Sequence, residues 1–525
     1  MIDTGDANLD AIVDGLLHGQ TDVESTEITY TFALPTSLAG VEGYSALNQA
    51  SIDRHLAVFA SVSTFTGATF REVDPIEEVP SFTFTFLEDV ATAYVVDFEG
   101  STLHVYNPER DQPELGSYTD HLILHEVGHA LGLEHGHEFN GTPREYQGHS
   151  WSVMSYRAHP DTESLFYTDS HGPETYMIAD IAALQYLYGA NFETQAGDTT
   201  YTVNFLTGEF FIDGVGQGVP INREVLRTIW DGAGNDTLDL SNALSRLEID
   251  LQPGAFTSFG DMFLAYQGQN EQGQALYAEG NLANPYLYQG NTSSLLENAI
   301  GGRFSDKIVG NVADNRLEGR GGNDSIFGLV GDDELIGGDG NDLIIDGVGD
   351  TTAAGDAGDD FVIVLSGTGS LTGGDDNDIL VGGIDNDVLD GGAGNDVLRG
   401  DAGHAFLFGA DQLIGGTGDD LLMGGRGADE FIFTPNSGED TIAAVKSTDL
   451  APGEIGSVAP EGADFRSGID LIVLQDFVDV TEENVMSFVA DDPDTGHAVF
   501  SAEGTLVHFF ALTMDQIAAE DFMFL

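Results

Sequence analysis

The sequence predicts two kinds of fold in one chain, an α+β domain over residues 1–195 followed by an all-β parallel β-roll over residues 196–525. The first observation behind this prediction is a nonapeptide, G-G-x-G-x-D-x-U-x with U apolar, which recurs from Gly301 onward. The second is that apolar residues before residue 195 alternate between helical and strand periods. The third is size, because 525 residues with 41% hydrophobic content suffice for more than one core.

The α+β prediction rests on a few elements near the N-terminus. Ser51–Phe65 has the period of a helix, whereas the alternating runs Ile28–Phe32 and Phe82–Phe86 have the period of strands. A further strand is expected at Ser101–Asn107, just upstream of a helix that carries two histidines.

That helix contains the pattern H-E-x-x-H-x-x-G-x-x-H, which begins at His125. His125 and His129 lie four residues apart, so their rings project from one helix face. Gly132 permits the tight or left-handed turn that would bring His135 back to the same point. Three neutral imidazoles suit one catalytic Zn²⁺ with an open position for water, and Glu126 is placed to act as general base. The motif therefore predicts amide hydrolysis without a covalent intermediate.

The repeats form a continuous series when the chain is counted in nines. Twelve units run from 301 to 408, residues 409–414 intervene, and two more units occupy 415–432. The eighth position is apolar in all fourteen units, so these side chains are expected to fill the roll. The sixth position is aspartate in ten units, at Asp306, Asp324, Asp333, Asp342, Asp360, Asp378, Asp387, Asp396, Asp420 and Asp429. The other four units have Asn315, Thr351, Gly369 and Ala405 there, where metal binding is expected to be lost.

The chemistry of each repeat predicts several bound calcium ions. Glycines let backbone carbonyls turn inward and aspartates supply hard oxygen ligands, so adjacent turns can share Ca²⁺. Without the ion, an acidic glycine-rich ribbon repels itself and loses much conformational entropy on ordering. Folding of residues 301–432 is therefore predicted to depend on calcium.

Taken together, these motifs resemble the serralysins, secreted bacterial metzincin proteases that carry an RTX β-roll. Ser-Val-Met-Ser-Tyr at residues 152–156 resembles the family's methionine turn. This implies that Met154 is an apolar floor and that Tyr156 is an additional zinc ligand. Leu9–Gly19 and residues 176–191 resemble the family's first mature helix and the helix that closes its protease domain.

The resemblance also implies further site residues. Residues 230–239 and 297–302 resemble the family's opening calcium sites, which makes Asp231, Asp236 and Glu297 expected calcium ligands. The strand at Ser101–Asn107 corresponds by resemblance to the upper rim of the cleft, where extended substrate would pair through its main chain. Broad specificity is the consequence expected from such binding.

Two functions follow from different weightings of these features. The resemblance implies a secreted zinc metalloendopeptidase that acts on extracellular proteins and peptides. The alternative is a calcium-dependent adhesive or surface protein whose protease domain is inactive. Glu126 together with the three histidines favours activity, because a decayed site would tolerate loss of the general base. An RTX lipase would require the nucleophile elbow G-x-S-x-G, which the sequence lacks.

The charge excludes some partners and bears on habitat. The formal net charge is −73, from 89 acidic and 16 basic residues, and the only lysines are Lys307 and Lys446. Nucleic acid is excluded as an expected partner because phosphate binding requires a basic surface. The near-absence of lysine predicts either a halophilic surface, screened by salt, or merely an acidic member of the family.

The remaining expectations concern location. No stretch approaches a membrane span, and the chain is expected to be a monomer. The opening Met-Ile-Asp-Thr-Gly-Asp lacks the features of a Sec signal, and Glu520–Leu525 resembles the C-terminal signal of type I secretion. Export by a type I secretion machinery to the extracellular space is therefore expected.

Overall fold

The chain folds into two units, each described here by itself. Unit 1 comprises residues 1–244 and 250–296, and unit 2 comprises residues 245–249 and 297–525. The predicted boundary between residues 195 and 196 stays a prediction. No helix in the described part of the chain is long and apolar enough to cross a membrane. The computed structural model describes residues 7–17, 23, 25–88, 90, 93–98, 101–108, 112–136, 143–162, 171–401, 409–443, 465–466 and 469–525.

Unit 1 begins with four α-helices and a mixed sheet, which confirms the predicted α+β fold. The helices are α1 (Ala7–Leu17), α2 (Gln49–Phe65), α3 (Tyr118–Ala130) and α4 (Ile178–Tyr188). The sheet has the order β3 (Thr69–Glu72), β1 (Glu27–Thr31), β4 (Phe82–Leu87), β6 (Ser101–Tyr106) and β5 (Ala93–Phe98), with β2 (Tyr44–Ser45) also paired to β4. Each predicted helix or strand of this region is present with ends shifted by a few residues at most.

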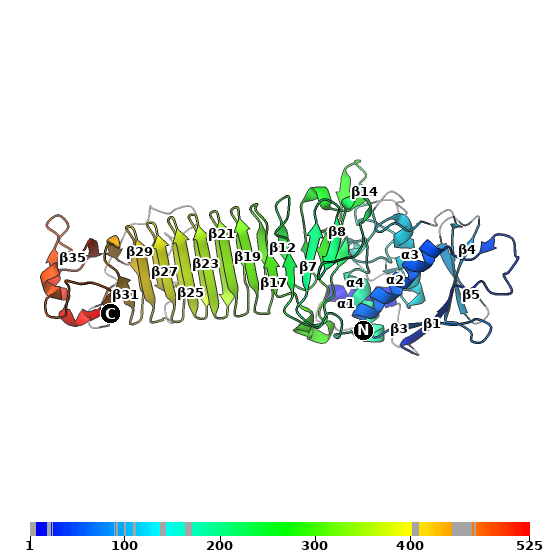
Figure 1. Ribbon diagram of the computed structural model, residues 1–525, viewed down its shortest axis with the longest axis horizontal. Helices are drawn as coiled ribbons and strands as arrows, with labels where there is room; N and C mark the ends of the chain where they lie inside the picture. Colours follow the sequence, from blue (N-terminus) through cyan, green and yellow to red (C-terminus); the bar gives the residue numbers. More distant parts are fainter. Residues whose placement is uncertain are drawn as a thin grey trace. The chain divides into compact units, whose positions relative to one another are not determined.

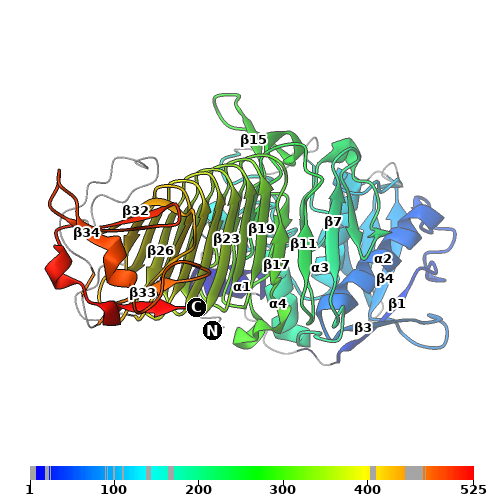
Figure 2. The ribbon, with the colours of Figure 1, turned by 60° about the vertical axis from the view of Figure 1, so that its left-hand side comes forward.

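The core of this part of unit 1 lies between α2 and the sheet (Figure 2). Asn48 caps α2, because its side-chain oxygen accepts a hydrogen bond from the Ser51 amide at 2.9 Å. Farther along α2, the Phe59 ring stacks on Phe70 of β3 with centroids 4.5 Å apart. Burial of such an aromatic side chain contributes about 2–3 kcal/mol to folding. The helix is thereby fixed against the strands that precede the histidine motif.

The rest of unit 1 is a set of short strands. The parallel pair of β7 and β11 continues through β8 to β9 by antiparallel pairing. Two smaller groups are β10 with β16 and β13, and β14 with β15. The bounds are β7 (Thr200–Asn204), β8 (Glu209–Ile212), β9 (Val215–Gly216), β10 (Arg227–Thr228), β11 (Thr237–Asp239), β13 (Phe256–Thr257), β14 (Tyr266–Gln269), β15 (Ala275–Tyr277) and β16 (Leu282–Ala283).

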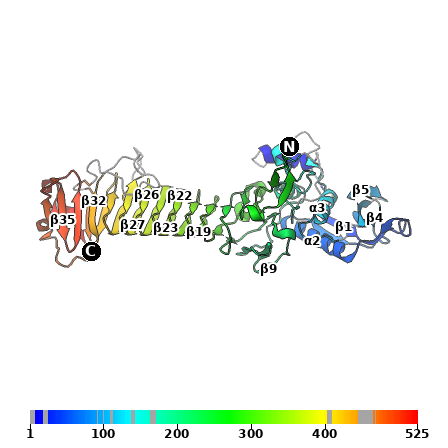
Figure 3. The same ribbon diagram turned by 90° about the horizontal axis from the view of Figure 1, so that it is seen from above.

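Unit 2 is a parallel β-roll, as predicted, with two sheets whose strands alternate along the chain (Figures 1 and 3). In the first sheet the order is β17 (Asn298–Ile300), β19 (Arg316–Gly321), β21 (Glu334–Asp339), β23 (Thr351–Ala357), β25 (Gly369–Asp375), β27 (Val388–Ala393), β29 (Gln412–Thr417), β31 (Glu430–Phe433), β33 (Leu471–Leu474) and β37 (Phe522–Phe524). In the second it is β12 (Glu248–Asp250, most of it in unit 2), β18 (Lys307–Val309), β20 (Ser325–Phe327), β22 (Leu343–Val348), β24 (Phe361–Ser366), β26 (Ile379–Gly383), β28 (Val397–Asp401), β30 (Leu421–Met423), β32 (Gly438–Ile442), β36 (Thr505–Phe509), β35 (Ala498–Ala502) and β34 (Val489–Asp491).

The strand register explains why the period is nine. Neighbouring strands of one sheet are offset by two repeats, so that Leu317 pairs with Leu335 and Ile326 with Ile344. The eighth-position side chains in the described part of the chain point into the roll. Those described at the predicted positions are buried: Ile308, Leu317, Ile326, Leu335, Ile344, Ala353, Val362, Leu371, Leu380, Leu389, Leu398, Leu422 and Phe431.

One part of the predicted repeat count is wrong. Val388 pairs with Gln412, an offset of 24 residues in place of 18, so the six extra residues lie inside the turn between Gly400 and Asp411. Asp411 therefore takes the sixth position that the sequence count gave to Ala405, and Leu413 takes the eighth. Residues 402–408, with Ala405 and Leu407, lie outside the described residues. The same holds for most of residues 442–467, which break the apolar pattern of the sequence and are predicted to be a surface insertion.

Candidate metal centres

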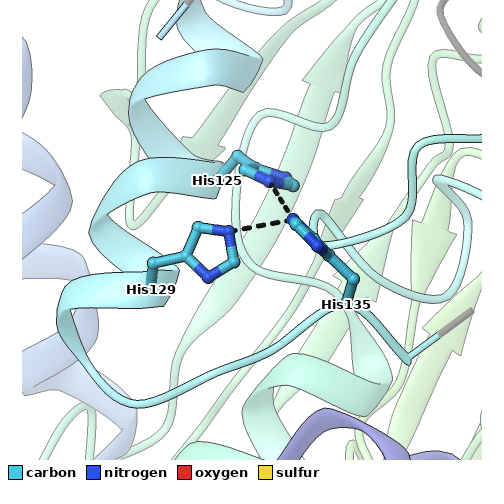
Figure 4. A group of neighbouring side chains, drawn as sticks. All are labelled: His125, His129 and His135. Carbon is cyan, nitrogen blue, oxygen red and sulfur yellow. Dashed lines mark hydrogen bonds between the residues drawn. The ribbon is translucent and has the colours of Figure 1, made fainter. Parts of the chain in front are cut away.

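Helix α3 and the turn after it bring the three motif histidines to one point (Figure 4). Ser117 caps the helix by accepting a hydrogen bond from the Asp120 amide at 3.1 Å. After the helix, Gly132 adopts a φ of 96°, the left-handed conformation that the sequence predicts for the reversal. One possible ligand atom from each of the three histidines lies within 4.8 Å of the other two.

Hydrogen bonds at the far side of two rings fix their ligand atoms. His125 Nδ1 lies 2.9 Å from the Val153 carbonyl and His129 Nδ1 lies 2.8 Å from the Leu133 carbonyl. A carbonyl only accepts, so each Nδ1 carries the hydrogen and each neutral ring has its lone pair on Nε2. Those Nε2 atoms lie 3.1 and 2.9 Å from His135 Nε2.

This donor set fits a tetrahedral zinc ion. Zn–N bonds of about 2.0–2.1 Å at tetrahedral angles place two ligand nitrogens about 3.3 Å apart, close to the observed spacings. Burial lowers the pKa of His125 well below its ordinary value, so the ring is neutral, as metal binding requires. A dication accepts all three lone pairs at once, whereas the lone pairs would otherwise repel each other.

Glu126 lies on the same helix turn and is buried. Its Oε2 atom has no hydrogen-bond partner, and burial raises the pKa of the carboxyl to about 8. An unsatisfied buried carboxylate next to a metal site is suited to hold a proton during a reaction. Glu126 directly follows His125 on α3, and its role as general base stays a prediction.

The methionine turn lies beneath the histidines. A Cβ on Gly128 would meet Met154 Sδ at 2.5 Å, so glycine at this position of α3 lets the helix approach the methionine. The Tyr156 ring lies beside the site, with its centroid 4.2 Å from that of His135 and 5.6 Å from that of His125. Its role as a zinc ligand stays a prediction.

The turn is held by Asp180 of α4, a residue that the sequence analysis missed. Asp180 accepts hydrogen bonds from the Ser152 hydroxyl at 2.6 Å and from the Val153 amide at 2.8 Å. Val153 in turn accepts from His125, so Asp180 positions a ligand ring through one intervening residue. Burial raises the pKa of Asp180 to about 7. A signal existed, because Asp180 interrupts an otherwise apolar helix start.

Two further histidines, His121 and His137, flank the motif in the sequence. His121 is buried and lies next to a second buried histidine, His149. The ring centroids of His121 and His149 are 4.3 Å apart, and burial lowers the pKa of both. Both rings are therefore neutral structural neighbours of His125. His137 lies outside the described residues.

The expected rim strand is wrong in one respect. Ser101–Asn107 forms β6, but β6 pairs with β4 on one side and β5 on the other, so its main chain is fully used. The strand at the end of the sheet is the antiparallel β5, which lies beside α3. The edge strand next to the histidines is therefore β5, because sequence order does not fix pairing order.

In unit 2 the repeat aspartates form a continuous ladder before the second sheet. The amide of each aspartate donates to Oδ1 of the aspartate in the next turn, at 2.6–3.1 Å. The members are Asp306, Asp324, Asp342, Asp360, Asp378, Asp396, Asp420 and Asp440, of which the sequence count missed the last.

The ladder before the first sheet is interrupted. Its members are Asn315, Asp333, Asp387, Asp411, Asp429 and Asp470, and Thr351 and Gly369 stand between Asp333 and Asp387. The predicted loss of aspartate therefore falls on two adjacent turns of one side. Asp411 and Asp470 extend this ladder beyond the sequence prediction.

The second carboxylate oxygens suit calcium. In nine of the ladder aspartates the Oδ2 atom is buried and lacks a hydrogen-bond partner, and burial raises the pKa of Asp324, Asp378, Asp387 and Asp420 to about 8. Hard cations with oxygen ligands satisfy such a row. The Oδ2 atoms without a partner belong to Asp324, Asp333, Asp342, Asp360, Asp378, Asp387, Asp396, Asp411 and Asp420.

The expected opening calcium ligands are partly brought together. Asp231 and Asp236 are buried side by side in unit 1, and burial raises their pKa values to about 6 and 7. Tyr201 donates its hydroxyl hydrogen to Asp231 at 2.5 Å, and the Thr199 amide donates to Asp236 at 2.8 Å. Glu297 lies in unit 2, where its backbone carbonyl accepts from Asn315. Calcium binding by these three residues stays a prediction.

Comparison with family models matches the chain from residue 190 onward. Residues 190–265 match the family model described as Peptidase M10 serralysin C terminal. Residues 300–335, 328–362, 372–407 and 408–433 match the RTX calcium-binding nonapeptide repeat. These two matches support the RTX part of the resemblance, which lies between residues 190 and 433.

Full-length relatives are matched over part of their length. Metallopeptidase AprA of Pseudomonas marginalis is 29% identical over 322 residues, which are 56% of this chain and 61% of the relative. Serralysin of Proteus mirabilis is 35% identical, over 39% of this chain and 38% of the relative. Serralysin G of Dickeya chrysanthemi is 32% identical, over 42% of each chain. The chain thus spans less than two thirds of the length of these relatives.

Proposed function

Because the chain is serralysin-like and carries RTX calcium-binding repeats, we propose that it is a secreted zinc metalloendopeptidase that hydrolyses extracellular proteins. The observation that carries the proposal is the convergence of three histidine Nε2 atoms beside the buried carboxylate of Glu126. Residues 1–195 would be the protease domain and residues 196–525 the RTX domain.

His125, His129 and His135 would hold one Zn²⁺, with Tyr156 as an additional ligand. When bound, the ion supplies Lewis acidity for the activation of water. Glu126 takes the proton of the attacking water on its carboxylate and returns it to the leaving amine. Met154 closes the floor of the site with an apolar side chain and thereby excludes water from below.

Substrate binding would use the edge strand β5 of the protease sheet. β5 lies beside α3 and pairs only on its β6 side among the described residues. An extended peptide added to this edge would bind through main-chain hydrogen bonds, which do not depend on side-chain identity. Broad specificity for proteins and peptides follows from this mode.

Calcium would gate the fold of the roll, and export would follow a type I route. The aspartate ladders hold orphan carboxylate oxygens that Ca²⁺ satisfies, so the roll is unfolded where calcium is scarce and folded outside the cell. The segment Glu520–Leu525 would serve as the export signal, although Phe522–Phe524 also forms β37 of the roll. Expected ligands are Asp231, Asp236, Glu297 and the repeat aspartates.

The test compares Glu126→Gln with the parent protein, loaded with zinc and calcium. We expect one zinc per chain in both and a fall in the rate of casein cleavage of about a hundredfold or more for the variant, because the ligands remain while the base is lost. Glu134→Gln is the matched control, since Glu134 is an exposed carboxylate in the turn that follows α3. The control should cleave casein like the parent.

Two results would overturn the proposal. Cleavage by Glu126→Gln within about tenfold of the parent would remove Glu126 from the mechanism. Absence of cleavage by the zinc-loaded parent, with calcium-dependent folding retained, would instead support a calcium-dependent adhesive or surface protein.

A further inference from the structure

The turn that contains Thr351 has a carboxylate in an unusual place. In the preceding turn of the same side of the roll, position one of the repeat is glycine, at Gly328. In the unit where the sixth-position aspartate is replaced by Thr351, position one is Asp346. Asp346 lies at the end of β22 and is fully buried, on the same inward face as Ile344. The unit that lost one aspartate has therefore gained another, five residues earlier.

The carboxylate of Asp346 points at Asp333, the aspartate of the preceding turn on the same side of the roll. A Cβ on Gly328 would touch both Asp333 Oδ2 and Asp346 Oδ1, so the two oxygens lie against the same small space. Gly328 leaves that space open because it has no side chain. Asp333 and Asp346 thus come from adjacent turns of the same side of the roll, like the aspartates of the regular ladders.

The two facing oxygens are both unsatisfied. Asp346 Oδ2 accepts the hydroxyl hydrogen of Thr351, but Oδ1 has no hydrogen-bond partner, and neither has Asp333 Oδ2. Two buried carboxylate oxygens that face each other repel unless a cation or a shared proton lies between them.

We propose that Asp333 and Asp346 together bind a calcium ion, so that the Thr351 turn keeps a metal site whose second carboxylate has moved from position six to position one. Thr351 then has a positioning role, because its hydroxyl orients Asp346 and leaves Oδ1 directed at Asp333. The proposal differs from the expectation that metal binding is lost wherever the sixth-position aspartate is missing.

The next turn provides an internal contrast. It has Gly369 at position six and the buried apolar Val364 at position one, so it has no carboxylate at either place. Val364 is the strand partner of Asp346 in the neighbouring β24. The proposed relocation therefore belongs to the Asp346 unit, and the Gly369 turn has no such replacement.

The experiment measures local calcium protection in the full-length protein. Hydrogen exchange of peptides that cover β21 and β23 is followed as calcium is added, for the parent and for Asp346→Asn. Asparagine keeps the shape of Asp346 and an acceptor for Thr351, but it removes the charge. We expect the calcium concentration for half-protection of these peptides to rise at least about tenfold in Asp346→Asn, because one charged ligand is lost.

Two further variants make the result decisive. Asp375→Asn removes an exposed carboxylate from the same roll and should leave the half-protection concentration unchanged. The double variant Asp346→Gly with Thr351→Asp returns the carboxylate to position six and should restore the parent value. If Asp346→Asn instead responds to calcium like the parent, the facing pair shares a proton and the proposal is wrong. This outcome is independent of the zinc site, because no protease activity is measured.

Discussion

At the scale of single residues, Asp180 shows how a distant helix controls the geometry of the histidines. Its carboxylate accepts from Ser152, Val153 and Met177, and Val153 passes the constraint to His125. Residues that hydrogen-bond to and orient the ligands of a metal commonly contribute to metal affinity as well as to structure. Asp180 is therefore a positioning residue of the proposed zinc site.

We predict that Asp180→Asn weakens zinc binding by about 10–100-fold, because loss of the negative charge weakens the hydrogen bonds that the Val153 and Met177 amides donate to this carboxylate. Stability should also fall by about 1.5–3 kcal/mol, the range for hydrogen bonds to a charged group. Zinc affinity is measured by chelator competition at pH 8, where Asp180 is mostly ionised. Asp161→Asn, at an exposed carboxylate of the same region, should bind zinc like the parent. Equal affinities in both variants would show that Asp180 does not position His125.

The residues that sequence analysis identified are those whose geometry is local. His125, Glu126 and His129 share one helix, and spacing alone places them on it. Asp180 was missed because its partners lie near residue 153, and no period connects a helix to a turn that far away. Asp346 was missed for another reason, because the repeats were searched for aspartate only at position six and Asp346 is at position one.

At the scale of elements, the apolar pattern predicted where the strands lie in the sequence but not which strands lie next to each other in the sheet. Residues Phe82–Phe86 were expected as a strand and form β4, which extends one residue further to Leu87. By contrast, β6 was expected at the rim, although β5 occupies the edge. Alternation reports which face of a strand is buried but not which strand lies beside it. The identity of an edge therefore requires the tertiary structure.

The same reason explains the error in the repeat count. Counting in nines gives the same total whether six extra residues follow a complete unit or lie inside a turn. Only the pairing of Val388 with Gln412 shows that the turn between Gly400 and Asp411 contains them. A long turn leaves the strands of a roll in register, so the core is unaffected by it.

The Gly369 turn offers an element-scale prediction. Gly369 donates its amide to Asp387 Oδ1 at 2.6 Å, like the aspartates elsewhere in the ladder, and it lacks a positive φ. Gly369→Asp should therefore complete the ladder and raise the melting temperature in calcium by about 2–4 °C, equivalent to about 1 kcal/mol. Gly369→Asn, which adds the same bulk without the charge, should give no such gain. An equal rise in calcium-free buffer would contradict a metal-based explanation.

At the scale of the whole molecule, the acidic charge and the buried aspartate ladders act in the same direction. With a net charge of −73, the chain repels itself, and the ladders concentrate part of that charge inside unit 2. Calcium and protons are two ways to relieve this repulsion. Adaptation to high salt would be a third, through screening, and it stays a prediction.

The last prediction concerns the competition between protons and calcium. Burial raises the pKa of Asp324, Asp378 and Asp420 from an ordinary 3.8 to about 8, so the calcium-free folded roll binds protons more tightly than the unfolded chain does. Stability from these groups is therefore fully present below about pH 4 and is lost as the pH rises toward 8.

We expect protein stripped of calcium on a chelating resin to contain more β-structure at pH 5.5, where protons balance the ladder carboxylates, than at pH 8, where the calcium-free roll is unfolded, at constant ionic strength. Circular dichroism of the β-structure is the measurement. In millimolar calcium the order should reverse, because protons displace the ion from carboxylates as the pH falls. Equal β-structure at both pH values in the calcium-free protein would show that protonation of the ladder carboxylates does not stabilise the roll.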